Sequence, residues 1–488
     1  MTGPQFLITP HLQDNNDLLK LKLKTKEDTE NELTLVYTDF NNSKTGTLLQ
    51  NECRSLVLNK DNKIISYSGE TPLINKEGMN YLLQHTTDKQ LITESYEGTI
   101  LSMFYHNDKW FVSTRRCLDC HDSKINGQSH YDMFNETLEL KKSSIPILNS
   151  EGVFSVPSNE TLEENIEEFF NKLDKSKSYY FVLLHHNNKL VIDYTSTHGE
   201  NYKKLYLTEV RDENMNELSL EENFIEHTNV LLPKKYESLD EFTEYNKTVT
   251  FEKPEKEGVI VKVWSEELNK YRMVKLQYNV YQFYQTSGFG QSNKTSENTN
   301  QVSVQNINQI KGLIYLYQID KLQEFFTQNP ESSHKKIINP TNSDEEFDIV
   351  GIIDAVFKTL SIELFELFKI LCDIKTGKQS PTKTELYNSL PKEYKDILYA
   401  IRGVYYKKKA LKFTEEDKTN SLLKYNDIYT LIKYLSTETI IAFLRQRKLM
   451  LNKLLPDFVS VNATCEKINL KYKMHNKLTD ILTNTLFP

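Results

Sequence analysis

The first 285 residues of the chain alternate between short apolar runs and polar turns. The runs are rich in β-branched and aromatic residues, as in 33–40 (LTLVYTDF), 98–114 (GTILSMFYHNDKWFVST), 179–194 (YYFVLLHHNNKLVIDY) and 257–264 (EGVIVKVW). Two of them contain turn-forming tetrads, HNDK and HNNK, between apolar residues, which is typical of β-hairpins. The stretch 160–175 (ETLEENIEEFFNKLDK) instead repeats its apolar residues at three- and four-residue steps, which predicts a helix. We therefore expect a mixed, mostly antiparallel α+β region.

The pattern changes after residue 285. Residues 286–304 (TSGFGQSNKTSENTNQVSV) carry too little apolar surface to offset the entropy of ordering, so we expect a flexible linker. Beyond it the apolar positions recur with a helical period. They include Ile353, Val356, Phe357, Leu360, Leu364, Leu367, Phe368 and Leu371, then Tyr394, Ile397, Leu398 and Ile401, then Ile428, Leu431, Ile432 and Leu435. The sequence thus predicts a core over 1–285, a linker over 286–304 and an all-α domain over 305–488.

Composition narrows the class of protein. No apolar run approaches the roughly 20 residues that a membrane-spanning helix needs, and the first residues (MTGPQFLITPHLQDNND) lack the features of a secretory signal. Five cysteines are too few and too scattered for a disulfide framework in a chain of 488 residues. We expect a cytoplasmic protein with no membrane contact. Its net charge of -8 excludes a uniformly basic nucleic-acid coat, so any contact with RNA must be local.

Four segments carry a resemblance to a known family. They are 52–68 (ECRSLVLNKDNKIISYS), 93–114 (TESYEGTILSMFYHNDKWFVST), 179–194 with 203–213 (KKLYLTEVRDE), and 257–281 (EGVIVKVWSEELNKYRMVKLQYNVY). In this order the chain resembles the phage-type ATP-dependent RNA ligases of the covalent nucleotidyltransferase superfamily. With its helical tail it is also similar to proteins of large DNA viruses. The resemblance implies an ATP-grasp-like nucleotidyltransferase core of antiparallel sheets and a bound ATP or GTP with Mg²⁺.

The resemblance also shows where the chain departs from the family. Such ligases use a lysine amine to attack the α-phosphate of ATP, and Ser95 stands at the matching position. Val182 replaces a glutamate that faces the nucleotide, and Met273 replaces the first lysine of the closing strand. A hydroxyl cannot form the phosphoramidate, so we expect binding without ligation. The alternatives are an active RNA ligase that uses another lysine, such as Lys89 or Lys109, and a structural or assembly subunit.

Several polar positions of the family are kept, and the resemblance implies that they line the nucleotide site. They are Arg54, Glu97, Gly98, Lys189, Glu257 and Lys275. Glu257 is also the expected ligand for Mg²⁺, which prefers carboxylate oxygens, and Tyr96 is the best candidate to stack on a base. We therefore predict a catalytically degenerate protein that binds a nucleotide or an RNA 5′ end, including an mRNA cap.

The helical domain adds two basic clusters that predict RNA contact. The first comprises Arg402, Lys407, Lys408 and Lys409, and the second Arg445, Arg447 and Lys448. Such clusters can bind phosphates in a salt-dependent way, although a solvated helix face has the same pattern. A protein partner is a further expectation for this domain. A weaker signal, Cys117, Cys120 and His121 with His130, has the spacing of a haem attachment or zinc site, and we favour neither.

Overall fold

The chain divides into two compact units, Met1–Gln282 and Phe283–Pro488. A computed structural model describes residues 3–12, 15–38, 46–86, 88–138, 147–148, 154–155, 160–251, 253–287, 300–330, 336–339, 342–372, 384–411, 423–452 and 472–487. Helix α8 (Asn279–Ser287) spans the boundary between the units. Most of the predicted linker falls outside the described residues, and its last residues belong to helix α9 (Asn300–Gln318).

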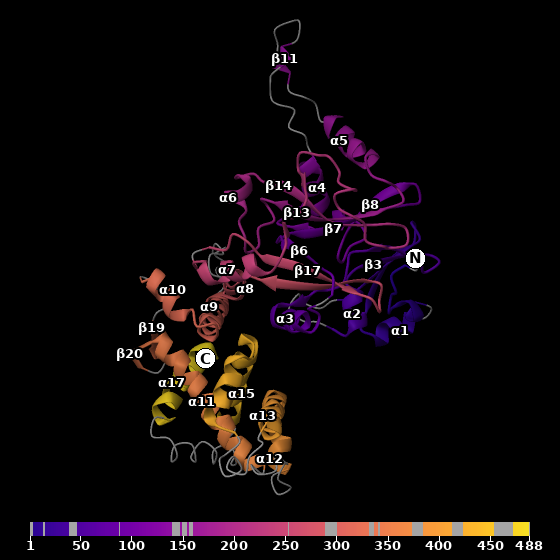
Figure 1. Ribbon diagram of the computed structural model, residues 1–488. Helices are drawn as coiled ribbons and strands as arrows, with labels where there is room; N and C mark the ends of the chain where they lie inside the picture. Colours follow the sequence, from indigo (N-terminus) through magenta and orange to yellow (C-terminus); the bar gives the residue numbers. More distant parts are fainter. Residues whose placement is uncertain are drawn as a thin grey trace. The chain divides into compact units, whose positions relative to one another are not determined.

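The first unit is built on two five-stranded sheets (Figure 1). One has the order β15-β14-β13-β7-β8, from Val230–Leu231, Lys203–Arg211, Ser178–His185, Thr99–His106 and Lys109–Thr114. The other has the order β16-β6-β17-β18-β5, from Lys235–Tyr236, Gln90–Ser95, Gly258–Ser265, Lys270–Gln277 and Leu73–Ile74. We call them the β7 sheet and the β17 sheet. All pairs are antiparallel except β14 with β15 and β18 with β5.

The two sheets face each other through one side each. The amine of Lys262 on β17 lies 3.3 Å from Oε1 of Glu209 on β14, so the inner faces meet. The outer face of the β7 sheet is covered by α4 (His130–Leu138) and α5 (Glu160–Asn171), and Phe134 and Phe169 pack there with Phe181 of β13 (Figure 1). The outer face of the β17 sheet packs on α3 (Asn75–Gln84). Any ligand site between the sheets is therefore lined by strand residues.

A third sheet, of four strands in the order β1-β2-β3-β4, lies at the N-terminal end. Its strands are Lys24–Asp28, Leu33–Tyr37, Leu56–Asn59 and Ile64–Tyr67, and α2 (Leu48–Glu52) precedes β3. The hydroxyl of Tyr180 on β13 accepts the backbone N–H of Tyr67 at 2.7 Å, which fastens β4 to the β7 sheet. Glu52 and Lys270 form a buried ion pair that ties α2 to β18. Arg54, in the turn after α2, is thereby held against the two large sheets.

Turn chemistry explains one of the two predicted hairpins and not the other. In HNDK, Asn107 and Asp108 take positive φ values of 46° and 59°, and β7 pairs with β8 as predicted. In HNNK, β13 ends at His185 and residues 189–194 form no strand, so this prediction was wrong. The backbone N–H groups of Val191 and Ile192 instead donate to the carboxylate of Glu97, which satisfies them without a strand partner.

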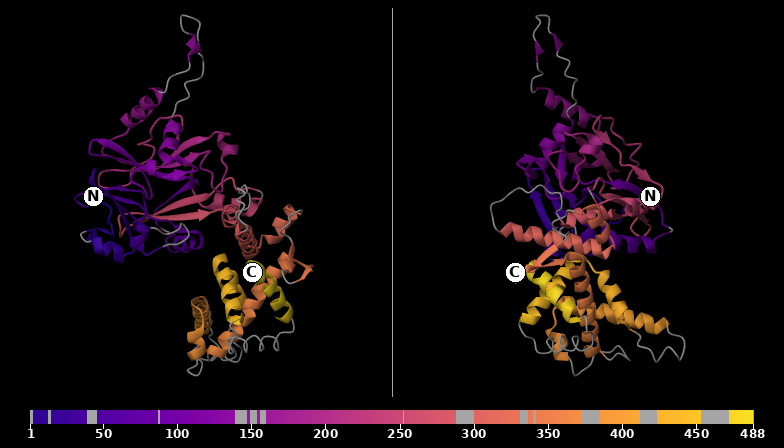
Figure 2. Two further views of the ribbon diagram at one scale, coloured as in Figure 1. Left: turned by 180° about the vertical axis from the view of Figure 1, so that it is seen from behind. Right: turned by 90° about the vertical axis from the view of Figure 1, so that its left-hand side faces the viewer.

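The second unit is mainly helical (Figure 2). Its helices are α9, α10 (Leu322–Gln328), α11 (Ile349–Leu371), α12 (Thr384–Ser389), α13 (Lys392–Leu411), α14 (Tyr425–Lys433), α15 (Thr437–Asn452) and α17 (Tyr472–Leu486). The stripe predicted on α11 is buried and packs against α14 and α17. One hairpin, β19 (Lys336–Asn339) with β20 (Asn342–Asp348), interrupts the predicted all-α pattern. The α+β class with a helical C-terminal region is confirmed, and no described helix is both long and apolar enough to cross a bilayer.

Candidate functional site

Ser95, Glu257 and Lys275 meet at one end of the β17 sheet. Ser95 ends β6 opposite Gly258, and Glu257 immediately precedes β17. The hydroxyl of Ser95 donates to Oε2 of Glu257 at 2.6 Å, and the amine of Lys275 donates to Oε1 at 2.7 Å. Gln277 adds a longer hydrogen bond to Oε1 at 3.4 Å. The Ser95 hydroxyl thus directs its proton at the Glu257 carboxylate.

The Glu257 carboxyl is ionised, although its side chain is only 5% exposed. Burial would raise its pKa, but the charge of Lys275 and the hydrogen bonds from Lys275, Ser95 and Gln277 outweigh it and hold the pKa below its usual value. A carboxylate with a lowered pKa is a weak base. Glu257 therefore does not activate the Ser95 hydroxyl as a nucleophile, and its oxygens are committed to donors rather than open to a metal.

Two glycines in the motifs are required by close backbone approach. A Cβ on Gly98, in the connection from β6 to β7, would lie 2.4 Å from the carbonyl oxygen of Leu183 on β13. A Cβ on Gly258 would lie 2.0 Å from the carbonyl oxygen of Leu276 on β18. The Gly98 position lets the chain cross from one sheet to the other, and the Gly258 position places Glu257 beside Lys275. The predicted site residue Gly98 has a structural role.

Arg54 supplies a cation with no fixed partner among the described residues. It lies partly buried in the turn between α2 and β3. Burial lowers its pKa, while the nearby carboxylates of Glu209 and Glu257 oppose that shift, so the guanidinium stays charged. No hydrogen bond or ion pair joins it to a residue within the described ranges. A partly buried arginine whose donors meet no acceptor among the described residues is suited to bind a phosphate.

A second charged cluster lies between the sheets and was missed from the sequence. Glu209 accepts from Arg211 at 2.6 Å, and Lys262 bridges Glu209 at 3.3 Å and Glu217 at 2.6 Å. Burial would lower the pKa of Lys262, but the charges of Glu209 and Glu217 raise it above its usual value. A protonated amine is not a nucleophile. The signal that could have revealed this cluster is the lone lysine in the inward-facing register of EGVIVKVW.

The two apolar substitutions lie on the inner faces as expected from their strands. Val182 on β13 is 9% exposed and Met273 on β18 is 8% exposed. A Cβ on Gly98 would meet Val182 Cγ1 at 2.8 Å, and one on Gly69 would meet Met273 Sδ at 2.9 Å. Both inner faces thus carry packed apolar side chains at these two positions.

Glu97, another predicted site residue, makes its hydrogen bonds within the protein. Both oxygens of Glu97 are occupied, since Oε2 accepts the N–H groups of Val191 and Ile192 at 2.8 and 2.7 Å and Oε1 accepts the Tyr281 hydroxyl at 2.6 Å. Burial raises the pKa of Glu97 although these hydrogen bonds oppose it. Glu97 therefore fastens a loop to the crossover from β6 to β7.

Tyr96 and Lys189 also have partners within the protein. The ring of Tyr96 stacks on Tyr206 of β14, with ring centroids 3.7 Å apart and planes inclined by 18°. Lys189 is exposed and donates to Asp193 at 3.1 Å. A base could use only the face of Tyr96 turned away from Tyr206.

The lysines considered as substitute nucleophiles lie far from Ser95. Lys89 precedes β6, which Ser95 ends, and six residues of extended chain span about 20 Å. Lys109 pairs with His106, the last residue of β7. Thr99, the first residue of β7, follows Ser95 closely, and the strand from Thr99 to His106 spans about 23 Å. Both side chains are exposed. Neither amine can reach the Ser95 position without refolding a strand.

The predicted basic clusters of the second unit are only partly at the surface. Arg447 is fully buried, and its guanidinium binds Glu363 at 2.8 to 3.0 Å and Asp480 at 2.8 Å. This prediction is corrected: the residue is a core ion-pair partner. Lys408 donates to Asp427 at 2.6 Å and Lys448 to the carbonyl of Phe487. Arg402 is partly buried, and Lys407, Lys409 and Arg445 are exposed.

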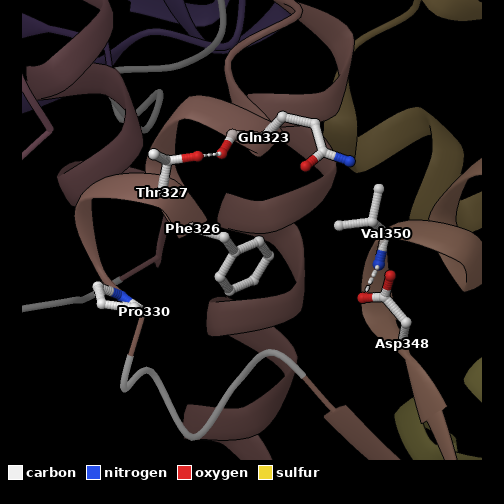
Figure 3. A pocket seen from close by; sticks show the side chains of 6 residues that line it. All are labelled: Gln323, Phe326, Thr327, Pro330, Asp348 and Val350. Carbon is white, nitrogen blue, oxygen red and sulfur yellow. Dashed lines mark hydrogen bonds between the residues drawn. The ribbon is translucent and has the colours of Figure 1, made fainter.

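A pocket in the second unit and the His and Cys residues of the first unit form neither a phosphate site nor a metal site among the described residues. A pocket of about 290 Å³ in the second unit is lined by Gln323, Phe326, Thr327, Pro330, Asp348 and Val350 (Figure 3). It contains no cation, and Asp348 is used to cap α11 through Val350 N at 3.2 Å. Among the described residues no cluster of three or more His, Cys, Asp or Glu side chains has the arrangement of a metal site. His121 pairs with Asp119 and His130 bonds to Ser123, away from a shared centre with Cys120.

Comparisons with known proteins give matches among solved structures alone. No protein-family description matches the chain, and no curated protein matches it. It is similar to a proposed ATP-dependent DNA ligase from Aquifex aeolicus, with 13% identity over 68% of this chain and 90% of that one and a TM-score of 0.34. An archaeal ATP-dependent RNA ligase is similar in two forms, with 10% and 12% identity, coverage of 66% and 64% of this chain and 80% and 75% of the others, and TM-scores of 0.33 and 0.28. These three structures are named as ATP-dependent ligases, and their similarity to this chain is too low to assign it an activity.

Proposed function

We propose that the first unit binds a phosphate-bearing ligand, either an ATP- or GTP-like nucleotide or the 5′ end of an RNA, without forming a covalent bond to it. The observation that carries this proposal is the hydrogen bond of 2.6 Å from Ser95 to Glu257, at the position where the resembling ligases place their lysine. The ordered ligase-like motifs support the class of ligand. The uncommitted guanidinium of Arg54 supports a phosphate as the recognised group.

The same geometry weighs against the active-ligase alternative. Lys275 on β18 and Lys262 on β17 are each held in an ion pair with a carboxylate. Lys89 precedes β6, at the end away from Ser95, and Lys109 lies at the turn between β7 and β8, also away from Ser95. A ligase would need an unprotonated amine beside the α-phosphate. Binding without transfer requires no change in any of these contacts.

Mg²⁺ fits this pocket only as part of the ligand. Both oxygens of Glu257 already accept hydrogen bonds, so its predicted role as a metal ligand would cost the ion pair with Lys275. Mg²⁺ commonly keeps several waters and is held by nucleotide phosphates. We propose that any Mg²⁺ enters with the phosphates, and that Arg54 and Lys275 face the same anionic group.

The second unit is proposed to add RNA contacts, and its exposed cations Lys407, Lys409 and Arg445 are the part of the predicted basic surface that stays open to solvent. A contact with a protein partner, a cytoplasmic location and a viral origin stay predictions.

A binding experiment tests the proposal. Equilibrium binding of ATP, GTP, a short 5′-triphosphate RNA and its capped form is measured with the full chain and with Arg54→Met. Because a charge-assisted hydrogen bond is worth about 1.5–3 kcal/mol, we expect Arg54→Met to weaken phosphate-dependent binding by roughly 10- to 100-fold. Arg116→Met, which changes an exposed arginine in the loop after β8, is the matched control. Failure of the wild-type chain to bind any of the ligands supports the structural-subunit alternative. If Arg54→Met binds as tightly as the wild type, Arg54 does not contact the ligand and the proposed site is wrong.

A further inference from the structure

A stripe of alternating cations and tyrosines runs along α13, exposed at both tyrosines and at its last lysine and partly buried at its other two cations. Its members are Lys395, Tyr399, Arg402, Tyr406 and Lys409, and we call them the α13 stripe. They are spaced by four, three, four and three residues, so at 100° per residue they fall within about 80° of the helix circumference. The helix rises 1.5 Å per residue, so the stripe is about 21 Å long.

The stripe lies beside the packed side of its helix, with the centres of the two roughly 100° apart around the axis. Tyr394, Ile397, Leu398, Ile401 and Tyr405 are buried and form that side. On the stripe, the side chains of Tyr399 and Tyr406 are 77% and 40% exposed. A tyrosine ring is large and mostly apolar, and a solvent-exposed ring face can stack on a base.

The cations are placed to support the rings. The guanidinium of Arg402 lies 5.6 Å from the centroid of the Tyr406 ring, which fixes the two side chains as one platform. Lys395 donates to the carbonyl of Asn388 at 2.9 Å, and Lys409 at the other end is exposed. The stripe thus offers positive charge beside each ring.

The charge of the helix selects the kind of partner. Within α13 six cations face two carboxylates, Glu393 and Asp396, and both carboxylates fall outside the arc of the stripe. The whole chain has a net charge of -8, so α13 is a local basic surface on an acidic protein. Such a surface attracts a polyanion, and it repels the same basic helix of a second copy of the chain.

We infer that the α13 stripe is a binding site for single-stranded nucleic acid, with bases stacked on Tyr399 and Tyr406 and phosphates held by Arg402, Lys395 and Lys409. The two rings are about 10 Å apart along the axis, which corresponds to about three nucleotides of a stacked strand. Base-on-tyrosine stacking is tolerant of sequence, and it needs unpaired bases. This inference rests on the proposed contact of the second unit with RNA and deepens it, since it names Tyr399 and excludes the buried Tyr405 and Arg447.

Fluorescence anisotropy of a labelled 12-nucleotide RNA, titrated with the full-length chain at two salt concentrations, tests the inference. Tyr399→Ala and Tyr406→Ala should each weaken binding by roughly 5- to 100-fold at both salt concentrations, because the lost contact is stacking. Tyr399→Phe should bind as the wild type does. Arg402→Gln should instead reduce the slope of log affinity against log salt by about 0.7. The control Tyr434→Ala changes another exposed tyrosine, at the end of α14 and 67% exposed, and should have no effect.

The outcomes separate this inference from the proposed pocket. A duplex of the same sequence should bind at least 10-fold more weakly than the single strand. Equal binding of duplex and single strand, or unchanged affinity of both tyrosine variants, overturns the stripe even when Arg54→Met weakens nucleotide binding. Tyrosine variants that change only the self-association of the chain in sedimentation overturn it in favour of a protein contact. If Tyr399→Ala loses RNA binding and the wild type binds no nucleotide, the inference for the α13 stripe is supported and the proposed nucleotide site in the first unit is rejected.

Discussion

The pairing of Glu257 with Lys275 makes an asymmetric prediction for stability. The Glu257 side chain is 5% exposed and the Lys275 side chain is 21% exposed. Lys275→Met leaves a buried carboxylate without its cation, and loss of one partner from a buried pair costs about 3–5 kcal/mol of unfolding free energy. Glu257→Gln leaves an amine that reaches water, so we expect a smaller cost of about 1–2 kcal/mol. The double variant removes both charges and should cost less than the sum, with a coupling of about 1–3 kcal/mol.

Tryptophan fluorescence reports this unit selectively. The two tryptophans of the chain, Trp110 on β8 and Trp264 on β17, both lie in the first unit. Urea unfolding followed by their fluorescence therefore gives the free energies of the two single variants and the double. Lys60→Ala, which breaks an exposed ion pair with Glu32, serves as the control and should leave the midpoint unchanged. The reasoning is refuted when Lys275→Met is no more destabilising than Glu257→Gln, or when the two effects simply add.

Three further predictions concern other parts of the fold. Gly98→Ala should lower the unfolding free energy of the first unit by about 1–3 kcal/mol in the same fluorescence assay, because its Cβ would lie 2.4 Å from the Leu183 carbonyl; an unchanged midpoint would contradict this prediction. Arg447→Met leaves the buried Glu363 carboxylate without its cation and should destabilise the second unit by about 3–5 kcal/mol, so the far-UV circular dichroism should fall at a lower urea concentration than in the wild type; an unchanged far-UV transition would contradict this prediction. Burial, and then the charge of His186, lowers the pKa of His185 to about 4 although Glu136 opposes it. Between about pH 6.5 and pH 4, His185 is therefore protonated in the unfolded chain but not in the folded chain. The unfolding free energy should fall by about 3 kcal/mol as the pH drops through that range, and His185→Gln should not show this fall.

The sequence predicted the parts of the fold that depend on local pattern. The hairpin of β7 and β8 follows from alternating apolar residues around Asn107 and Asp108, and α11 follows from its apolar stripe, so the α+β class with a helical tail is confirmed. The failure at 189–194 has a nonlocal cause. Val191 and Ile192 have strand-like side chains, but a carboxylate 94 and 95 residues earlier binds their N–H groups and replaces a neighbouring strand.

The sequence indicated candidate polar residues for the site, but it did not indicate which of them form ion pairs. Of the predicted residues, Ser95, Glu257 and Lys275 meet because strand pairing brings β6, β17 and β18 together, whereas Lys189 is exposed. Which charges are free depends on tertiary contacts that periodicity does not encode. Arg447 has the sequence context of a surface cation, yet Glu363, 84 residues earlier, makes it a core residue. Glu209 and Lys262 meet only because two sheets face each other, and a single strand pattern cannot show that.

The presence or absence of a covalent nucleotide adduct tests the central claim most directly. The wild-type chain is incubated with ATP or GTP and Mg²⁺ under conditions where binding is saturated, then denatured and weighed by intact-protein mass spectrometry. A hydroxyl bound to Glu257 at the Ser95 position predicts an unchanged mass. A mass gain of one nucleoside monophosphate, on any residue of the first unit, would contradict the account.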